Sequence, residues 1–194
     1  MKTCGGRAGG AAEGRESAAP VLSSAAVRQI WAPWRMEYVG DSTPRAGCVL
    51  CAIDAGGTDQ EKHVVERAEL TFTVLNLYPY SSGHLLVVPH RHAPDLTALS
   101  PTEGAGMFLG VQRAVRALQA ALGPDGFNLG VNQGRIAGAG IADHVHTHVV
   151  PRWDGDTNFM PVLADVKVLP EHLDRTAERL RAAYAELAPD PAGG

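Results

Sequence analysis

The stretch HVHTHVV, residues 144–150, places three histidines two positions apart along one short segment. The residues between and after them are Val and Thr, which are typical of a β-strand. Side chains alternate between the two faces of a strand, so the pattern predicts a strand from His144 to Pro151 that presents all three imidazoles on one face. Residues two apart on that face have Cα atoms about 6.6 Å apart. The row therefore suits a ligand with repeated groups, such as a chain of phosphates.

A glycine-rich loop, GRIAGAG at residues 134–140, comes directly before this strand. Glycines allow successive backbone N–H groups to approach an anion closely, so the loop predicts a phosphate-binding nest. The formal net charge is −4 and the pI is near 6.0, which excludes attraction of nucleic acid or acidic membranes by a general basic field. A phosphate ligand therefore needs a local site. A neutral imidazole beside that site is a good nucleophile towards phosphorus.

The cysteines are Cys4, Cys48 and Cys51. An odd number with one Cys-x-x-Cys pair is typical of a cytoplasmic protein whose thiols bind metal or stay reduced, and not of a disulfide framework. Structural zinc takes four ligands, and His92 and His144 are the candidates that would complete the pair. Two thiolates neutralise Zn²⁺, so such a site can be buried. A reduced pair packed as small apolar residues is the alternative.

Composition divides the chain into a tail, a domain and a short end. Residues 1–27 are rich in Gly, Ala, Ser and Glu, which predicts a disordered tail; residues 28–187 form one domain, and residues 188–194 fray. No apolar run is long enough to span a bilayer. The expected helices are a short one entered at 47–51, a long one at 97–122 and a C-terminal one at 170–187. The expected strands, which make the fold α+β, are 64–67, 70–75, 84–88, 127–132 and 144–151.

Three other features complete the prediction from the residues. Ser100 and Pro101 mark a break in the long helix, or its start, with Ser100 as the N-cap. The aromatic-rich residues 30–39 are expected to pack on the domain or against a second subunit. The remaining histidines, which we interpret as surface residues, are His63, His90 and His172.

These motifs together resemble the histidine triad family. The stretch 144–150 matches the family signature His-φ-His-φ-His-φ-φ, where φ is apolar, with Thr147 at one φ position. The segment Asn76-x-x-Pro79-x-x-x-Gly83-His84 resembles the family's nucleotide-site segment, and residues 127–134 resemble the strand and loop before the triad. Residues 151–159 are similar to the branch that contains diadenosine polyphosphate hydrolases and diadenosine tetraphosphate phosphorylases. The resemblance covers about residues 28–187.

The resemblance implies a fold, an activity and partners. The fold is a mainly antiparallel five-stranded sheet with one long and one C-terminal helix, and the sheet is extended across a homodimer. The activity is cleavage of a dinucleoside polyphosphate at the α-phosphorus through a nucleotidyl-histidine intermediate, followed by hydrolysis or phosphorolysis. The implied partners are a purine nucleotide or dinucleoside polyphosphate and a second copy of the chain, without nucleic acid or membrane.

The resemblance also assigns roles to individual residues. His146 is the nucleophile, His148 hydrogen-bonds a phosphate oxygen, and His84 supports the histidine cluster from the adjacent strand. Asn76 contacts the ribose, and Asn132 contacts the α-phosphate or its leaving oxygen. The expected phosphate-loop residues are Gly134, Gly138 and Gly140.

A zinc site and one departure from the family pattern follow from the same comparison. Cys48 and Cys51 with His92 and His144 resemble the zinc site of some bacterial members and of galactose-1-phosphate uridylyltransferases, in which the metal positions the strand beside the nucleophile. Gly140 stands where several members place a Gln or Ser that assists the leaving group. Hydrolysis, phosphorolysis, phosphoramidase activity and nucleotide binding without turnover therefore all remain open.

Overall fold

The structure is a computed structural model of the 194-residue chain, and it describes residues 47–156 and 171–188. Three of the expected segments lie wholly or partly outside the described residues: the tail at 1–27, the aromatic segment at 30–39 and the C-terminal end at 188–194, of which only residue 188 is described. The same holds for residues 157–159, the end of the segment 151–159 that resembles one branch of the family.

Five strands form one antiparallel sheet in the order β1-β2-β3-β5-β4. The strands are β1 (Val64–Arg67), β2 (Thr71–Leu75), β3 (Leu85–Pro89), β4 (Gly126–Gly130) and β5 (Thr147–Arg152). The predicted α+β class and the five-stranded antiparallel sheet are therefore confirmed. In the ladder between β3 and β5, Leu86 lies opposite His148. This register brings His84, just before β3, next to the histidine segment that is 60 residues away in the chain.

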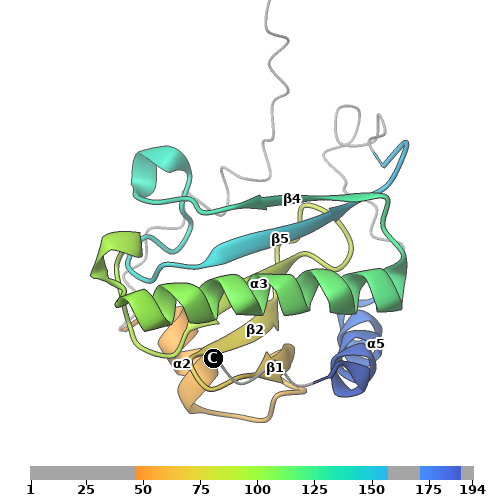
Figure 1. The fold of residues 1–194 in the computed structure, drawn as a ribbon, viewed down its shortest axis with the longest axis horizontal. Coiled ribbons are helices and arrows are strands. Elements are labelled where there is room, and N and C mark those ends of the chain that lie inside the picture. The colour runs from red at the N-terminus through yellow and green to blue at the C-terminus, as the bar shows by residue number, and fades with distance from the viewer. Residues whose placement is uncertain (1–46, 157–170, 189–194) are drawn as a thin grey trace, which may run out of the picture. The chain divides into compact units, whose positions relative to one another are not determined.

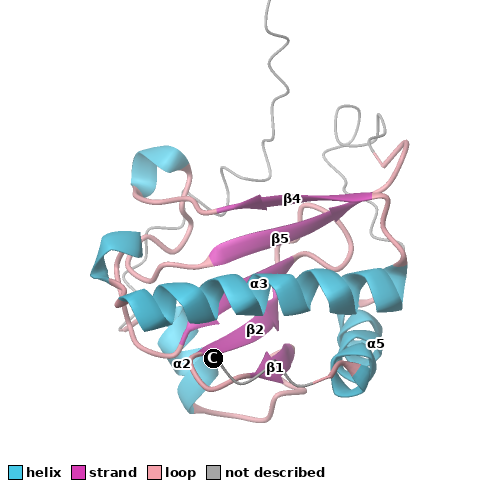
Figure 2. Cartoon of the chain, viewed as in Figure 1, coloured by secondary structure: helices cyan, strands magenta, loops and turns pink. Residues whose placement is uncertain are grey.

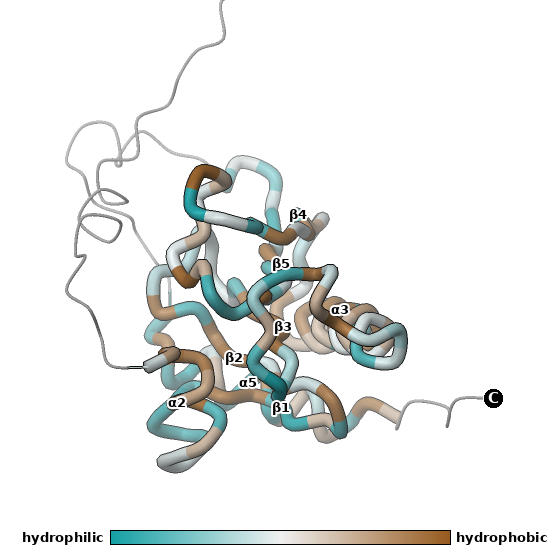
Figure 3. Tube along the Cα trace, turned by 90° about the vertical axis from the view of Figure 1, so that its left-hand side faces the viewer, coloured by the Kyte–Doolittle hydropathy of each residue, from teal (hydrophilic) through white to brown (hydrophobic). Residues whose placement is uncertain are grey.

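Helices cover both faces of this sheet (Figures 1 and 2). On β3, Leu85 and Val87 pack in one apolar cluster with α3 (Pro101–Leu122) and α5 (Leu173–Glu186). The alternate residues Leu86 and Val88 pack in a second cluster with Leu50 of the short helix α2 (Val49–Ala55). Neighbouring strand residues point to opposite faces, so α2 lies on the face away from α3 and α5. The rotated view in Figure 3 shows the strands between α2 and α3.

The long helix α3 begins and ends at residues that cap its backbone. The Ser100 hydroxyl accepts the Glu103 N–H, and the Glu103 carboxylate accepts the Ser100 N–H, which is a capping box. Pro101 occupies the first turn, where its missing N–H is not needed. Gly123 ends the helix at φ 59°, a left-handed conformation that suits glycine.

The expected helix at 97–122 is two elements. Leu96–Ala98 form a separate 3₁₀ turn, η1, because the Asp95 carboxylate accepts the N–H groups of Thr97 and Ala98. Ser100 is extended, as a residue before proline prefers, so α3 starts only at Pro101. Within the described residues, no helix is both long and apolar enough to cross a membrane.

The predicted strand at 144–151 was wrong at its start, because β5 begins at Thr147. Before it, the Val145 N–H donates to the Ala93 carbonyl, outside the sheet ladder, and the His144 ring donates to the Pro89 carbonyl. Pro89 has no N–H to offer a neighbouring strand. Pairing with β3 therefore stops at Val87 opposite Thr147.

Candidate functional site

The histidines of the HVHTHVV stretch divide between two neighbouring clusters. His148 on β5 lies next to His84, which precedes β3. The ring centroids of His148 and His146 are 4.9 Å apart. His144 lies with two cysteines of the α2 segment and with His92, which follows β3. We call the first group, His84, His146 and His148, the catalytic cluster, after the role predicted for these residues from the sequence. We call the second, Cys48, Cys51, His92 and His144, the metal cluster.

Hydrogen bonds to His84 fix the proton positions of two members of the catalytic cluster, His84 and His148. The Tyr80 backbone N–H donates to His84 Nδ1 over 3.1 Å, so that nitrogen is an acceptor and the neutral ring carries its proton on Nε2. His84 Nε2 lies 2.9 Å from His148 Nδ1 and donates to it. His148 then carries its own proton on Nε2 and offers a donor there.

Asn76 and Tyr80 support this arrangement from the segment after β2. The Asn76 Oδ1 atom accepts the Tyr78 N–H, which turns the Nδ2 atom of Asn76 to within 3.4 Å of His84 Nδ1. The Tyr80 ring stacks on the His84 ring with centroids 4.8 Å apart. His84 itself is fully buried. Asn76 thus lies beside the catalytic cluster, and its contact with ribose remains a prediction.

His146 has the opposite tautomer. Its Nδ1 atom lies 2.8 Å from the His144 carbonyl oxygen, which only accepts, so Nδ1 carries the proton and Nε2 carries a lone pair. The side chain is 4 % exposed. Burial lowers the pKa of His146 more than the bond to the His144 carbonyl raises it, so the ring is neutral near pH 7. A neutral imidazole with an open Nε2 is the form that can attack phosphorus.

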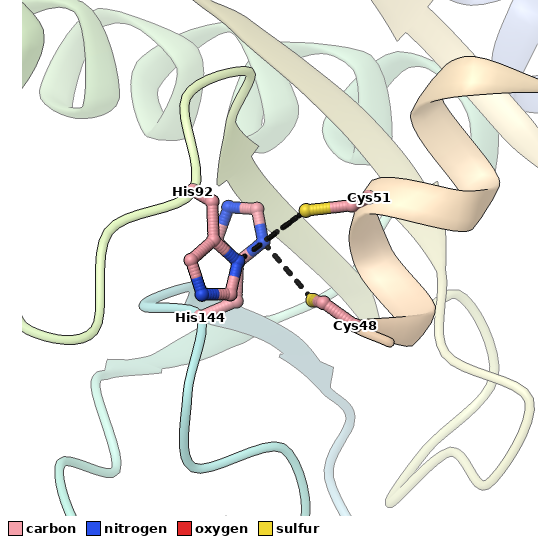
Figure 4. A group of neighbouring side chains, drawn as sticks. All are labelled: Cys48, Cys51, His92 and His144. Carbon is pink, nitrogen blue, oxygen red and sulfur yellow. Dashed lines mark hydrogen bonds between the residues drawn. The ribbon is translucent and has the colours of Figure 1, made fainter. Parts of the chain in front are cut away.

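The metal cluster brings four donor atoms within 4.8 Å of one another (Figure 4). His144 Nδ1 lies 3.3 Å from Cys48 Sγ and 3.5 Å from Cys51 Sγ, and His92 Nδ1 lies 3.3 Å from Cys51 Sγ. Donor atoms at the corners of a tetrahedron around Zn²⁺ are roughly 3.3–3.8 Å apart. The fold therefore brings the four predicted ligands together, and these three distances lie at the spacing of a zinc site.

The protonation of the metal cluster also fits a cation. His144 Nε2 donates to the Pro89 carbonyl over 3.0 Å, which leaves the lone pair on Nδ1, facing both sulfurs. Burial is the main cause that lowers the pKa of His144, so its ring is neutral. Partial burial, followed by the hydrogen bond and charge of Cys48, raises the pKa of the Cys51 thiol. A bound cation reverses that effect, because a coordinated thiol loses its proton.

The expected phosphate-binding residues lie in the connection from β4 to His144. Gly134 and Gly138 flank a short 3₁₀ turn, η2 (Arg135–Ala137), and have positive φ values of 82° and 83°. Asn132 lies between β4 and this turn, and Gly140 follows it. Gly130, the last residue of β4, pairs with His148, so the connection leaves the sheet beside the catalytic cluster. Phosphate binding by these four residues remains a prediction.

Sequence reasoning missed polar contacts behind the metal cluster. His90, interpreted as a surface residue, bonds to both Asp54 and the Ala68 carbonyl, and Arg67 also reaches Asp54. His63, another expected surface residue, has a side chain 16 % exposed and pairs with Asp174 of α5. The signal in the sequence was the position of Asp54 one helical turn after Cys51, which puts both side chains on the same side of a helix.

Comparison with known proteins identifies the family. The model of the HIT domain matches residues 58–155. The AP-4-A phosphorylase of Mycobacterium tuberculosis is 38 % identical over 166 residues, which are 82 % of this chain and 85 % of the relative. The chain belongs to the histidine triad (HIT) family. This confirms the resemblance seen in the sequence.

Two further members extend the comparison of this HIT protein. A Zn-bound histidine triad family protein from Mycobacterium smegmatis has a crystal structure that aligns with a TM-score of 0.60 and 33 % identity over 72 % of this chain and 94 % of that one. The asymmetrical bis(5'-nucleosyl)-tetraphosphatase of Schizosaccharomyces pombe is 33 % identical over 93 residues, which are 48 % of this chain and 50 % of the relative. Members similar to this chain therefore include two enzymes named for dinucleoside polyphosphates.

Proposed function

We propose that the protein is an enzyme that cleaves dinucleoside polyphosphates, such as diadenosine tetraphosphate, through a nucleotidyl-histidine intermediate on His146. Phosphorolysis is the favoured second step. The relative named as a phosphorylase aligns over 82 % of the chain, whereas the relative named as a tetraphosphatase aligns over 48 %. Hydrolysis is the second candidate, supported by that shorter match.

One observation carries the proposal: His146 and His148 lie side by side with opposite tautomers. His146 offers a lone pair on Nε2, because its Nδ1 proton is held by the His144 carbonyl. His148 offers a proton on Nε2, because its Nδ1 accepts from His84. The ring centroids are 4.9 Å apart. A nucleophile and a hydrogen-bond donor so close together suit attack on a phosphorus atom whose oxygens gain charge.

The two steps balance as follows. The Nε2 lone pair of His146 forms a bond to the α-phosphorus, and the bond from that phosphorus to the bridging oxygen breaks. The remaining nucleotide leaves with the electron pair on this oxygen, as ATP when the substrate is diadenosine tetraphosphate. An oxygen of inorganic phosphate then forms a bond to the α-phosphorus and displaces His146, which releases ADP. Attack by water in place of phosphate releases AMP.

The surrounding residues bind and orient the substrate. Gly134, Gly138 and Gly140 supply backbone N–H groups to the phosphates, and Asn132 supplies its amide to the α-phosphate or leaving oxygen. Asn76 hydrogen-bonds the ribose through Oδ1, which accepts one bond from Tyr78 and has a second lone pair.

The metal cluster holds zinc as a structural ion. When bound, zinc cross-links the cysteine pair to His92 and His144 and supplies no group to the reaction. His144 connects this site to the nucleophile, because its side chain is a ligand while its carbonyl holds the Nδ1 proton of His146. The hydrogen bond from the Val145 N–H to the carbonyl of Ala93, which follows His92, joins the segment of His144 to the segment of His92.

A homodimer completes the proposal. β4 is one of the two edge strands of the sheet, and its exposed residues include Leu129 at 53 %. A second copy added at this edge would continue the sheet. Light scattering of the purified protein tests the dimer.

The cytoplasmic location predicted from the reduced cysteines is also part of this proposal.

The activity is tested with diadenosine tetraphosphate and purified protein, with and without inorganic phosphate. We expect ADP and ATP in equal amounts only when phosphate is present, and an AMP adduct on His146 in protein quenched during turnover. AMP and ATP without phosphate would identify a hydrolase. Cleavage of an adenosine phosphoramidate alone would identify a phosphoramidase, and binding without any product would contradict an enzyme.

A further inference from the structure

The helix that carries the cysteines is too short to hold its own position. α2 has seven residues, and isolated helices below about 12 residues are unstable in water. Leu50 is its one buried residue and packs against Phe72 and other side chains of the second apolar cluster. Cys48 and Cys51 therefore depend on other contacts for their distance from His92 and His144.

Asp54 makes two such contacts. It lies three residues after Cys51, on the same side of α2. Its Oδ1 atom accepts from Arg67 Nη1 of β1, and its Oδ2 atom lies 2.9 Å from His90 Nδ1. The Asp54 side chain is only 19 % exposed, so these bonds are partly shielded from water.

His90 transmits this contact to the histidine half of the metal cluster. Its Nε2 atom lies 2.9 Å from the Ala68 carbonyl oxygen, and its ring stacks on Phe72 with centroids 5.7 Å apart. The ring is thereby fixed on three sides: by Asp54, by Ala68 and by Phe72. His92, the most exposed of the four ligands, is two residues further along the same segment.

We propose that Asp54 is a positioning residue of the metal site, which ties the helix of Cys48 and Cys51 to the segment of His92. This inference rests on the proposed zinc site. The segment of the cysteine pair and the segment of His92 are distant in sequence and meet only in the folded chain.

 Cys51 and His92 are 41 positions apart along the chain. A contact that holds the two segments together before the metal binds lowers the entropic cost of bringing the ligands together around the metal.

The proposal predicts a loss of metal affinity when Asp54 is changed. Residues that orient metal ligands typically contribute about 10- to 100-fold in affinity. We expect Asp54→Ala to weaken zinc binding by that factor. Asp54→Asn keeps the shape and one acceptor oxygen, so it is expected to weaken zinc binding less.

Asp59 provides the matched control. It also accepts from Arg67, at 2.9 Å, but its side chain is 41 % exposed and it belongs to the loop after α2. Because it contributes an exposed ion pair and no bond to His90, we expect Asp59→Ala to change zinc affinity less than about 3-fold.

A second control separates positioning from general stability. Glu66 forms a well-shielded ion pair with Arg113 of α3, with side chains 11 % and 12 % exposed. Glu66→Gln is expected to lower the melting temperature, because it weakens a shielded pair, while zinc affinity stays within about 3-fold of wild type.

The experiment measures zinc transfer from the loaded full-length protein to a chromogenic chelator, together with melting temperatures of all variants. Wild-type protein that holds no zinc would overturn both the zinc site and this role of Asp54. Wild-type protein that holds one zinc, with Asp54→Ala equal to it in affinity, would overturn the role of Asp54 alone. The role would also be overturned if Glu66→Gln lost as much affinity as Asp54→Ala for an equal fall in melting temperature.

Discussion

The catalytic cluster and the metal cluster each contain a histidine from the start of the HVHTHVV stretch, yet His146 and His144 present opposite ring nitrogens. His144 donates from Nε2 to the Pro89 carbonyl and turns the Nδ1 lone pair to the cysteines. His146, two residues later, donates from Nδ1 to the His144 carbonyl and keeps the lone pair on Nε2. A single backbone acceptor at each ring decides which nitrogen is available. Neighbouring histidines therefore acquire different chemistry from their hydrogen-bond partners.

The largest effect is expected from His146→Asn. Asn cannot form the nucleotidyl intermediate, so kcat should fall by roughly 10⁴- to 10⁶-fold, as for other nucleophiles. Nucleotide affinity should stay within a few-fold of wild type, measured by calorimetry beside steady-state kinetics. Substantial turnover by this variant would remove His146 from the chemistry and end the distinction between the two clusters.

Changes at His148 and His84 should have the next largest effect. Loss of one preorganised donor to developing charge typically lowers kcat by about 10²- to 10³-fold, which we expect for His148→Ala. His84→Ala should act through His148, because His84 donates to its Nδ1. The double variant should therefore be no slower than the slower single variant. Additive losses in the kinetic cycle would contradict a connected pair.

Cys51→Ser is expected to affect stability more than chemistry. Loss of one ligand should remove zinc and lower the melting temperature by several degrees, since about 1 kcal/mol corresponds to roughly 2–4 °C for a protein of this size. The kcat per folded molecule should stay within about 10-fold of wild type. Zinc content by atomic absorption, melting temperature and kcat are measured on the same sample. Folded, zinc-free protein without activity would place the metal in the reaction.

The smallest effect is expected from Tyr80→Leu. This change removes the ring that stacks on His84 but keeps the backbone N–H that fixes the His84 tautomer. We expect kcat to fall only about 3- to 10-fold, because an aromatic contact contributes about 0.5–1.5 kcal/mol. A loss as large as that of His84→Ala would mean that the ring, and not the N–H, controls this part of the cluster.

Much of the site could be predicted because its residues carry a strong local pattern. The alternating histidines identified the family, and the Cys-x-x-Cys pair with two further histidines predicted four ligands that the fold does bring together. The start of α3 at Pro101 was also marked in the sequence, although the turn at Leu96–Ala98 was merged with it.

Other features depend on partners far away in the chain. The start of β5 follows from bonds to Pro89 and Ala93, which no pattern within residues 144–151 contains. The contact between Asp54 and His90 joins residues 36 positions apart, and each alone resembles an ordinary surface residue. A tautomer likewise depends on an acceptor that only the folded chain supplies.

The sequence by itself determined the family, the α+β class and the identities of the nucleophile and ligand candidates, because these depend on residue type and short spacing. Only the tertiary structure decided where β5 begins and that Asp54 and His90 contact each other. It also decided which nitrogen each ring exposes. The physical reason is that hydrogen bonds act over about 3 Å, a distance set by the packing of strands and loops that are distant in sequence.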